Sequence, residues 1–443
     1  MGDGDCDCLY NIVPDLVAPA SMQGQLKGST HVALINAGAI AQMFSDPVQR
    51  NVLILAICQA LGSTGMSMLA AVASLVGYAL VDDKSLATLP VAVQWTATMI
   101  TTIPASHLMR WIGRRAGLSV GVLVQMSGGL VGCYAIVQAN FGVFLLASVF
   151  VGIGTSFIQY YRFAAVDAVP ESFRGKAISL VLAGGVVAAV LGGELAKWSF
   201  DWFLPYVYAG CYIAMACLCL VVLIALQGVR IPRLSAQQRA SSGRPLWAIA
   251  KQPVFIVAVL AGALSYGSMV LVMTATPLAM GASGFVFTDS ATVIQWHVLA
   301  MYAPSFFTGS LIQRFGVLTI ILCGTVLMLT ALVVGLSGIA FMNFWGCLFL
   351  VGLGWNFMFV GGSTLLTSAY TIEERAKVQA ANDFTVFSVT ALSAFGSGAL
   401  LTRLGWDGVT SGVAPAMGLA LIAVLWLMAL QRRQAGQPQA GAS

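Results

Sequence analysis

The sequence contains VGIGTSF at residues 151–157 and VGLGWNF at residues 351–357, nearly the same phrase about 200 positions apart. Glycine pairs in apolar helices also recur simply because they allow helices to pack closely. Here the similarity extends well beyond the glycines, and several matches at one spacing indicate that the two halves of the chain are copies of one unit. The further matches are Gln94-Trp95 with Gln295-Trp296, Pro104 with Pro304, and Arg174-Gly175-Lys176 with Arg375-Ala376-Lys377.

The composition excludes a water-soluble protein. Hydrophobic residues make up 59% of the 443 residues and charged residues only 8%, too few to cover a soluble surface. The apolar runs are long enough to cross a hydrocarbon core of about 30 Å as helices, which satisfy their own backbone hydrogen bonds. They lack the alternation of transmembrane strands. The sequence therefore predicts an all-α integral membrane protein.

Polar breaks divide the apolar sequence into twelve predicted helices, six on each side of a basic segment at 228–252. The predicted organisation is a tail at 1–50, a six-helix bundle at 51–227, a linker at 228–252, a second bundle at 253–432 and a tail at 433–443. The predicted helices are 52–80, 88–109, 117–138, 141–167, 174–196, 205–227, 253–279, 289–313, 317–337, 341–369, 375–400 and 407–431.

The distribution of Lys and Arg among the predicted loops indicates the orientation in the membrane. Loops on the side of the termini and linker are rich in cations, whereas the opposite loops hold only Lys84, Lys197 and Arg403. Because Lys and Arg near helix ends stay preferentially on the cytoplasmic side, we expect both termini to be cytoplasmic. The expected location is the cell membrane, in a bacterium the inner membrane. The net charge of +5 thus reports topology and gives no sign of nucleic-acid binding.

From residue 50 to residue 432, the chain resembles the major facilitator superfamily of secondary transporters. The loop SHLMRWIGRR at 106–115, its second copy GSLIQRFG at 309–316 and PESFRGKA at 170–177 are similar to the family's loop motifs. The resemblance implies alternating access between two pseudo-symmetric bundles. An acid that helps to lock one face in the family is replaced here by Arg110 and Gln313, so we expect a different gate. The matching loop residues are Gly113, Arg114, Arg115, Arg174, Gly309, Arg314, Gly316 and Arg375.

Aromatic and amide side chains gather in the helices that face the cavity of this family. Such rings bind a planar heteroaromatic solute well, because most pocket surface is apolar and a few polar groups set the orientation. Ordinary membrane packing is the alternative for each ring, and Arg162 is also close enough to its helix end to snorkel. The candidate substrate-binding residues are Gln94, Trp95, Gln159, Tyr160, Arg162, Gln295, Trp296, Trp355 and Asn356.

Two ionisable residues are expected near the bilayer centre, His297 and Asp383. Because intramembrane charge is costly, such residues usually face a cavity or a partner. A His–carboxylate pair could take up and release a proton near neutral pH and so couple a gradient to transport. The alternative is a fixed polar contact between helices.

We therefore expect a monomeric carrier that moves a small organic solute, with uptake of a nutrient, such as a flavin-type vitamin, as the first hypothesis. Proton-coupled export of drugs or metabolites is the second, although the proline of the family's antiporter signature is missing from GGVVAAVLGGELA at 184–196. A non-transporting receptor or assembly factor is the third. We expect no enzyme activity, no cofactor and no metal, since Cys6 and Cys8 have no further ligands close by.

Overall fold

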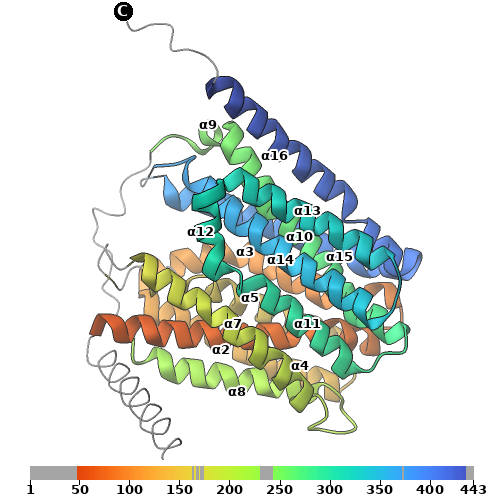
Figure 1. Cartoon of the computed structure of the whole chain (residues 1–443). Helices are drawn as coiled ribbons and strands as arrows, with labels where there is room; N and C mark the ends of the chain where they lie inside the picture. The colour runs from red at the N-terminus through yellow and green to blue at the C-terminus, as the bar shows by residue number, and fades with distance from the viewer. Residues whose placement is uncertain are drawn as a thin grey trace, which may run out of the picture.

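The computed structural model describes residues 47–161, 164, 165, 169, 174–229, 243–371 and 374–435. Every regular element in these ranges is helical, and most are long helices that run side by side (Figure 1). Nine stretches of the described chain are long and apolar enough to cross a membrane. Arg162, Cys6, Cys8 and most of the linker lie outside the described residues.

The first half of the described chain contains six long helices and a short 3-10 turn. Helix α2 packs against α7 and α8, α4 against α5 and α8, and α3 against α5. Most of their buried apolar side chains form one hydrophobic core. The elements are α2 (Pro47–Leu80), η2 (Lys84–Leu86), α3 (Leu89–Ile112), α4 (Arg114–Val137), α5 (Phe141–Ile158), α7 (Arg174–Ser199) and α8 (Ala209–Leu226).

The second half repeats these pairings. Helix α10 packs against α15 and α16, α13 against α14 and α16, and α11 against α14. A second hydrophobic core lies among them, and Trp95 and Ala92 of the first half belong to it. The elements are α9 (Leu246–Ala250), α10 (Pro253–Ala282), α11 (Phe287–Tyr302), α12 (Ser305–Phe315), α13 (Val317–Leu336), α14 (Phe341–Thr367), α15 (Arg375–Ser411) and α16 (Ala414–Ala435).

The repeated glycines lie where helices approach most closely. A β-carbon at Gly152 would lie 2.2 Å from the carbonyl oxygen of Gln94, and one at Gly352 would lie 2.5 Å from that of His297. Any side chain at these positions would push α5 away from α3, or α14 away from α11. The repeated phrase therefore reflects both the duplication and close packing.

The loops after α3 and α12 show the same duplication in their backbone. Gly113 has φ 90° and ψ 157°, and Gly316 has φ 87° and ψ 148°. A positive φ of this kind favours glycine, and both residues cap the preceding helix and begin the next one.

Several helix boundaries differ from the expected ones. The expected helix 289–313 divides at Ala303-Pro304 into α11 and α12, because proline lacks the N–H that would continue the helical hydrogen bonds. The expected helix 141–167 is regular only to Ile158. The expected helix 407–431 begins at Ala414, whereas α15 extends to Ser411 across Gly405, whose φ is 67°.

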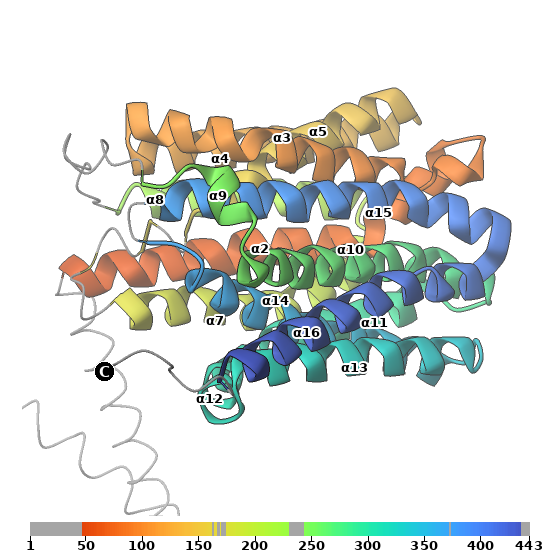
Figure 2. The same ribbon diagram turned by 90° about the horizontal axis from the view of Figure 1, so that it is seen from above.

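The bundle has two distinct ends. The start of α2, the short helix α9 and the end of α16 lie together at one end, which we call the linker end (Figure 2). The opposite end, where η2 and the start of α3 lie, is called the distal end.

Candidate binding site between the two halves

Six aromatic rings from both halves meet in the interior, and we call them the central aromatic cluster. Tyr266 lies in its middle, with its ring centroid 5.4 Å from that of Trp95 and 5.4 Å from that of Trp355. Trp95 comes from the first half of the chain, so the cluster joins the halves. Its members are Trp95 in α3, Tyr266 in α10, Tyr302 in α11, Trp355 and Phe359 in α14, and Phe387 in α15.

The rings form two stacked pairs with Tyr266 edge-on to both. Trp355 and Phe359 stack at 4.9 Å with 10° between their planes. Trp95 and Phe387 stack at 5.8 Å with 21° between their planes. Offset-stacked and edge-to-face arrangements are the favourable geometries of aromatic rings. The cluster thus gathers several flat apolar rings, stacked face to face and edge to face, at the boundary between the halves.

The structure separates the candidate residues of the first half. Trp95 is in the cluster, but the amide of its neighbour Gln94 lies 3.9 Å from the sulfur of Met66 in α2. Tyr160 donates a hydrogen bond to the carbonyl oxygen of Thr102 at 2.7 Å and ties the end of α5 to α3. Gln159 caps α5, and Arg162 lies outside the described residues.

Asn356 is fully buried next to Trp355, but its hydrogen bonds are local. Its Nδ2 donates to the carbonyl oxygen of Met301 at 2.6 Å and to Oγ of Ser305 at 2.7 Å, while its Oδ1 accepts from Thr308 at 2.7 Å. These partners lie on either side of the break between α11 and α12. Asn356 therefore satisfies polar groups at that break.

Gln295 and Trp296 lie apart from the cluster. Trp296 is 43% exposed, and its ring packs 6.0 Å from that of Trp345 on the outside of the bundle. Gln295 faces α7 of the first half, where its Nε2 donates to the carbonyl oxygen of Val190 at 3.0 Å. Its Oε1 accepts from Lys197 at 3.0 Å.

His297 and Asp383 are not joined by a hydrogen bond in this structure. Nδ1 of the fully buried His297 donates to the carbonyl oxygen of Leu348 at 2.6 Å, and its Nε2 has no partner among the described residues. Asp383 is half-buried and accepts from the side chain of Asn382 at 3.1 Å. The histidine thus connects α11 to α14, whereas the aspartate lies on α15.

Comparisons with known proteins agree with this architecture. A sequence model of the Major Facilitator Superfamily matches residues 55–294. The chain belongs to the major facilitator superfamily. It is 40% identical over 379 residues to the riboflavin transporter RfnT of Brucella anthropi. The aligned region covers 85% of this chain and 95% of that protein. Two uncharacterized MFS-type transporters of Bacillus subtilis are each 27% identical to this chain. The match to YdeG covers 80% of this chain and 85% of YdeG, and the match to YddS covers 78% of this chain and 83% of YddS.

Membership of the superfamily makes the chain a multi-pass membrane transporter. In such a carrier the two halves must separate at one end and then at the other. The contacts that hold each end together therefore bear directly on function, and the sequence pattern did not indicate the two that follow.

At the distal end, Thr88 inserts its hydroxyl into helix α15. Its Oγ1 donates to the carbonyl oxygen of Ala394 at 3.1 Å and accepts from the backbone N–H of Gly398 at 3.0 Å. These two backbone groups are one helical turn apart. A β-carbon at Gly398 would lie 2.5 Å from this hydroxyl oxygen, so the glycine makes the approach possible. Together with Gln295 between α11 and α7, Thr88 holds the halves together at this end.

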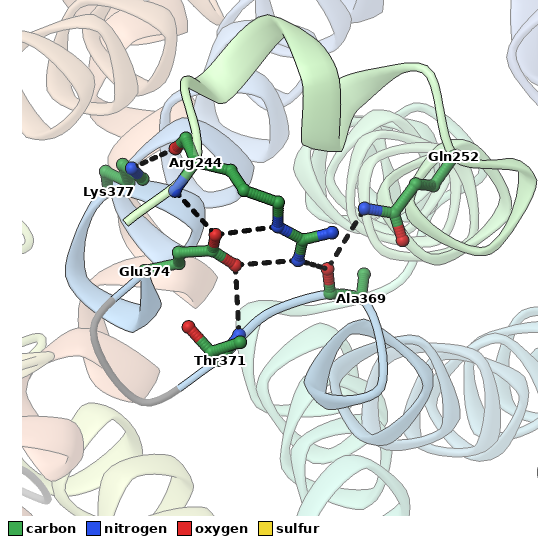
Figure 3. Close-up of polar contacts among 6 residues, drawn as sticks. All are labelled: Arg244, Gln252, Ala369, Thr371, Glu374 and Lys377. Atoms are coloured by element: carbon green, nitrogen blue, oxygen red, sulfur yellow. Dashed lines mark hydrogen bonds and ion pairs between the residues drawn. The ribbon is translucent and has the colours of Figure 1, made fainter. Parts of the chain in front are cut away.

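At the linker end, Glu374 holds the chain that leads into α9 (Figure 3). Its carboxylate accepts from Nε and Nη2 of Arg244 at 2.7 and 2.8 Å, and from the backbone N–H groups of Arg244 and Thr371 at 2.8 and 3.0 Å. Lys377 donates to the carbonyl oxygen of Arg244. The hydrogen bonds from the Arg244 side chain hold the pKa of Glu374 far below its usual range. The carboxylate therefore stays ionised and fixes the linker to the start of α15.

The predicted gating loops also lie at the linker end. Nη1 of Arg115 lies 3.5 Å from the carbonyl oxygen of Gln227, and the guanidinium of Arg314 lies 5.3 Å from the ring centre of Phe315. Arg114 is half-buried and Arg375 is exposed. Gly309 has no atom near the position of a β-carbon, and the side chain of Arg174 lies outside the described ones.

Thr88→Val should weaken closure of the distal end, because valine keeps the shape of threonine but loses both hydrogen bonds. We expect a cysteine at Ala92, which is fully buried one turn further along α3, to react with a soluble thiol reagent about tenfold faster in the valine variant. Labelling of purified protein measures this rate. Thr88→Ser keeps the hydroxyl and should react like the parent, and equal rates in all three proteins would show that Thr88 does not hold this end closed.

Proposed function

We propose that this transporter imports a flat heteroaromatic vitamin of the flavin type by alternating access. The observation that carries the proposal is the 40% identity to a riboflavin transporter over 95% of that protein. The central aromatic cluster supports it independently, because it offers stacked and edge-on rings at the boundary between the halves.

The chemistry of the cluster suits a fused ring system. A flavin presents two large flat faces, which stack on aromatic side chains, and an edge that carries carbonyl and ring-nitrogen acceptors. In the described structure the rings contact one another, so an entering flavin would replace ring–ring contacts with ring–ligand contacts. Separation of α3 from the second half would open the face of Trp95 toward Phe387.

We propose that the chain crosses the membrane twelve times, as two six-helix bundles at 51–227 and 253–432 joined by the linker at 228–252. Nine stretches meet the criteria of length and hydropathy. The 26-residue helix α7 and the broken helix formed by α11 and α12 are the further spans, and the stretch 377–433 contains both α15 and α16.

We further propose that the linker end faces the cytoplasm and that the membrane is the inner membrane of a bacterium. The positions of Arg114, Arg115, Arg314, Arg432 and Arg433 at this end support the orientation.

The uptake of radiolabelled riboflavin by bacteria that lack their own transporter tests the substrate. Cells that express the chain should accumulate the vitamin, and Tyr266→Leu should raise KM about tenfold, because leucine removes the central ring of the cluster. The matched control is Trp345→Leu, which removes a ring that stacks with Phe349 at 5.1 Å outside the cluster. Loss of preloaded riboflavin would instead indicate export, and no flux would indicate a receptor.

We propose that Asp383, rather than the fully buried His297, carries a coupling proton. Asp383→Asn should abolish accumulation driven by an imposed proton gradient, yet leave exchange of riboflavin down its own gradient intact, because an amide cannot take up the proton. Uptake and exchange in the same vesicles separate the two effects. Accumulation of wild-type size in the asparagine variant would remove Asp383 from the mechanism. For His297→Gln we expect chiefly a lower thermal stability.

The orientation is tested with a cysteine at Ser241 in the linker and one at Ser337, which lies in the loop between α13 and α14 at the distal end. In intact cells an impermeant thiol reagent should label the cysteine at 337 above the background of the native cysteines, but should label the one at 241 only after the cells are opened. The reverse result would show that the linker faces outward.

A further inference from the structure

Trp355 differs from Trp406, another buried tryptophan of the second half, in the hydrogen bonding of its indole N–H. The Trp355 side chain is 5% exposed, and its Nε1 has no hydrogen-bond partner among the residues that the structure describes. Trp406 is 7% exposed, and its Nε1 donates to the carbonyl oxygen of Gly335 at 2.9 Å. Buried N–H groups are usually paired, so the unpaired one calls for an explanation.

The surroundings of Trp355 are aromatic. Phe359 stacks on its ring at 4.9 Å, and Tyr266 and Tyr302 lie edge-on at 5.4 and 6.1 Å. Leaving an N–H unpaired among such rings is unfavourable, and folding alone gives no reason to keep it. A phenylalanine would supply the same stacking face without the unpaired donor.

The neighbouring amides are engaged elsewhere. In Asn356, the next residue, both the side-chain oxygen and the side-chain nitrogen form hydrogen bonds at the break between α11 and α12. Gln94, beside Trp95, directs its amide nitrogen to Met66. The indole of Trp355 is therefore a donor within the cluster that the described chain does not itself use.

We propose that the indole N–H of Trp355 donates a hydrogen bond to a carbonyl oxygen or ring nitrogen on the edge of the transported solute, and so determines specificity. This inference rests on the proposed function and adds a named donor to it. Stacking alone accepts any flat aromatic compound, because every ring has a face. A site built around a buried donor discriminates against compounds that lack the matching acceptor, because they leave the donor unpaired.

The test is the binding of riboflavin to the purified full-length protein, followed through the fluorescence of the flavin. Trp355→Phe keeps an aromatic ring and removes the N–H, and we expect Kd and the KM of uptake to rise about tenfold. Trp406→Phe is the matched control. It removes an N–H that has an internal partner, so it should lower Tm and leave Kd unchanged.

The outcomes separate the inference from the function on which it rests. Riboflavin bound with equal Kd by the wild type and by Trp355→Phe would overturn the role of Trp355 and leave the proposed function standing. A wild-type protein that does not bind riboflavin would overturn both.

A second measurement does not depend on folding of the variant. In wild-type protein with ¹⁵N-labelled tryptophan, riboflavin should move the indole N–H resonance of Trp355 downfield, as a new hydrogen bond requires. An unchanged resonance at saturating riboflavin would overturn the proposal.

Discussion

The structure depends on one constraint, that a backbone inside a membrane has no water with which to form hydrogen bonds. Long helices satisfy this constraint by themselves, because their backbone groups form hydrogen bonds with one another. Where a helix is broken, a side chain must supply the hydrogen bonds that the backbone loses. The break at Ala303-Pro304 is accompanied by Asn356, whose amide binds the carbonyl of Met301 and the hydroxyls on the other side of the break. Thr88 likewise bonds to backbone groups, because its hydroxyl donates to the carbonyl oxygen of Ala394 and accepts from the N–H of Gly398 in α15. Buried polar residues in this protein therefore often serve the backbone.

Close packing is the second consequence of the membrane environment. Because lipid is as apolar as a leucine side chain, helices gain little from hydrophobicity alone and rely on close approach. Gly152 and Gly352 allow such an approach at matching places in the two halves. The helices of the two halves pair in the same way. The aromatic cluster lies where the two repeated units meet, because Trp95 of the first half packs on Tyr266 and Phe387 of the second.

The sequence predicted the helical membrane fold and the duplication, because composition and spacing carry this information directly, and it indicated the family through the resemblance of its loop motifs. Trp95 and Trp355 were also named from sequence, and both lie in the cluster. The sequence could not show that Asn356 faces a helix break or that Trp296 faces outward, since the direction of a side chain depends on neighbouring helices. Thr88 and Ala394 are 306 residues apart, and Arg244 and Glu374 are 130 apart. No local pattern marks such pairs, so both contacts emerged only from the fold.

One helix pair, α3 with α15, connects the distal contact to the candidate site. Thr88 binds α15 at the distal end, Ser388 of α15 donates to the sulfur of Met99 in α3 at 3.0 Å, and Trp95 stacks on Phe387 in the same interface. These contacts lie along the same two helices, and helices are stiff. A separation of α3 from α15 at the distal end therefore also loosens the stack of Trp95 on Phe387. Access to the distal side and exposure of an aromatic face thus become one movement, which is what alternating access requires of a site between two halves.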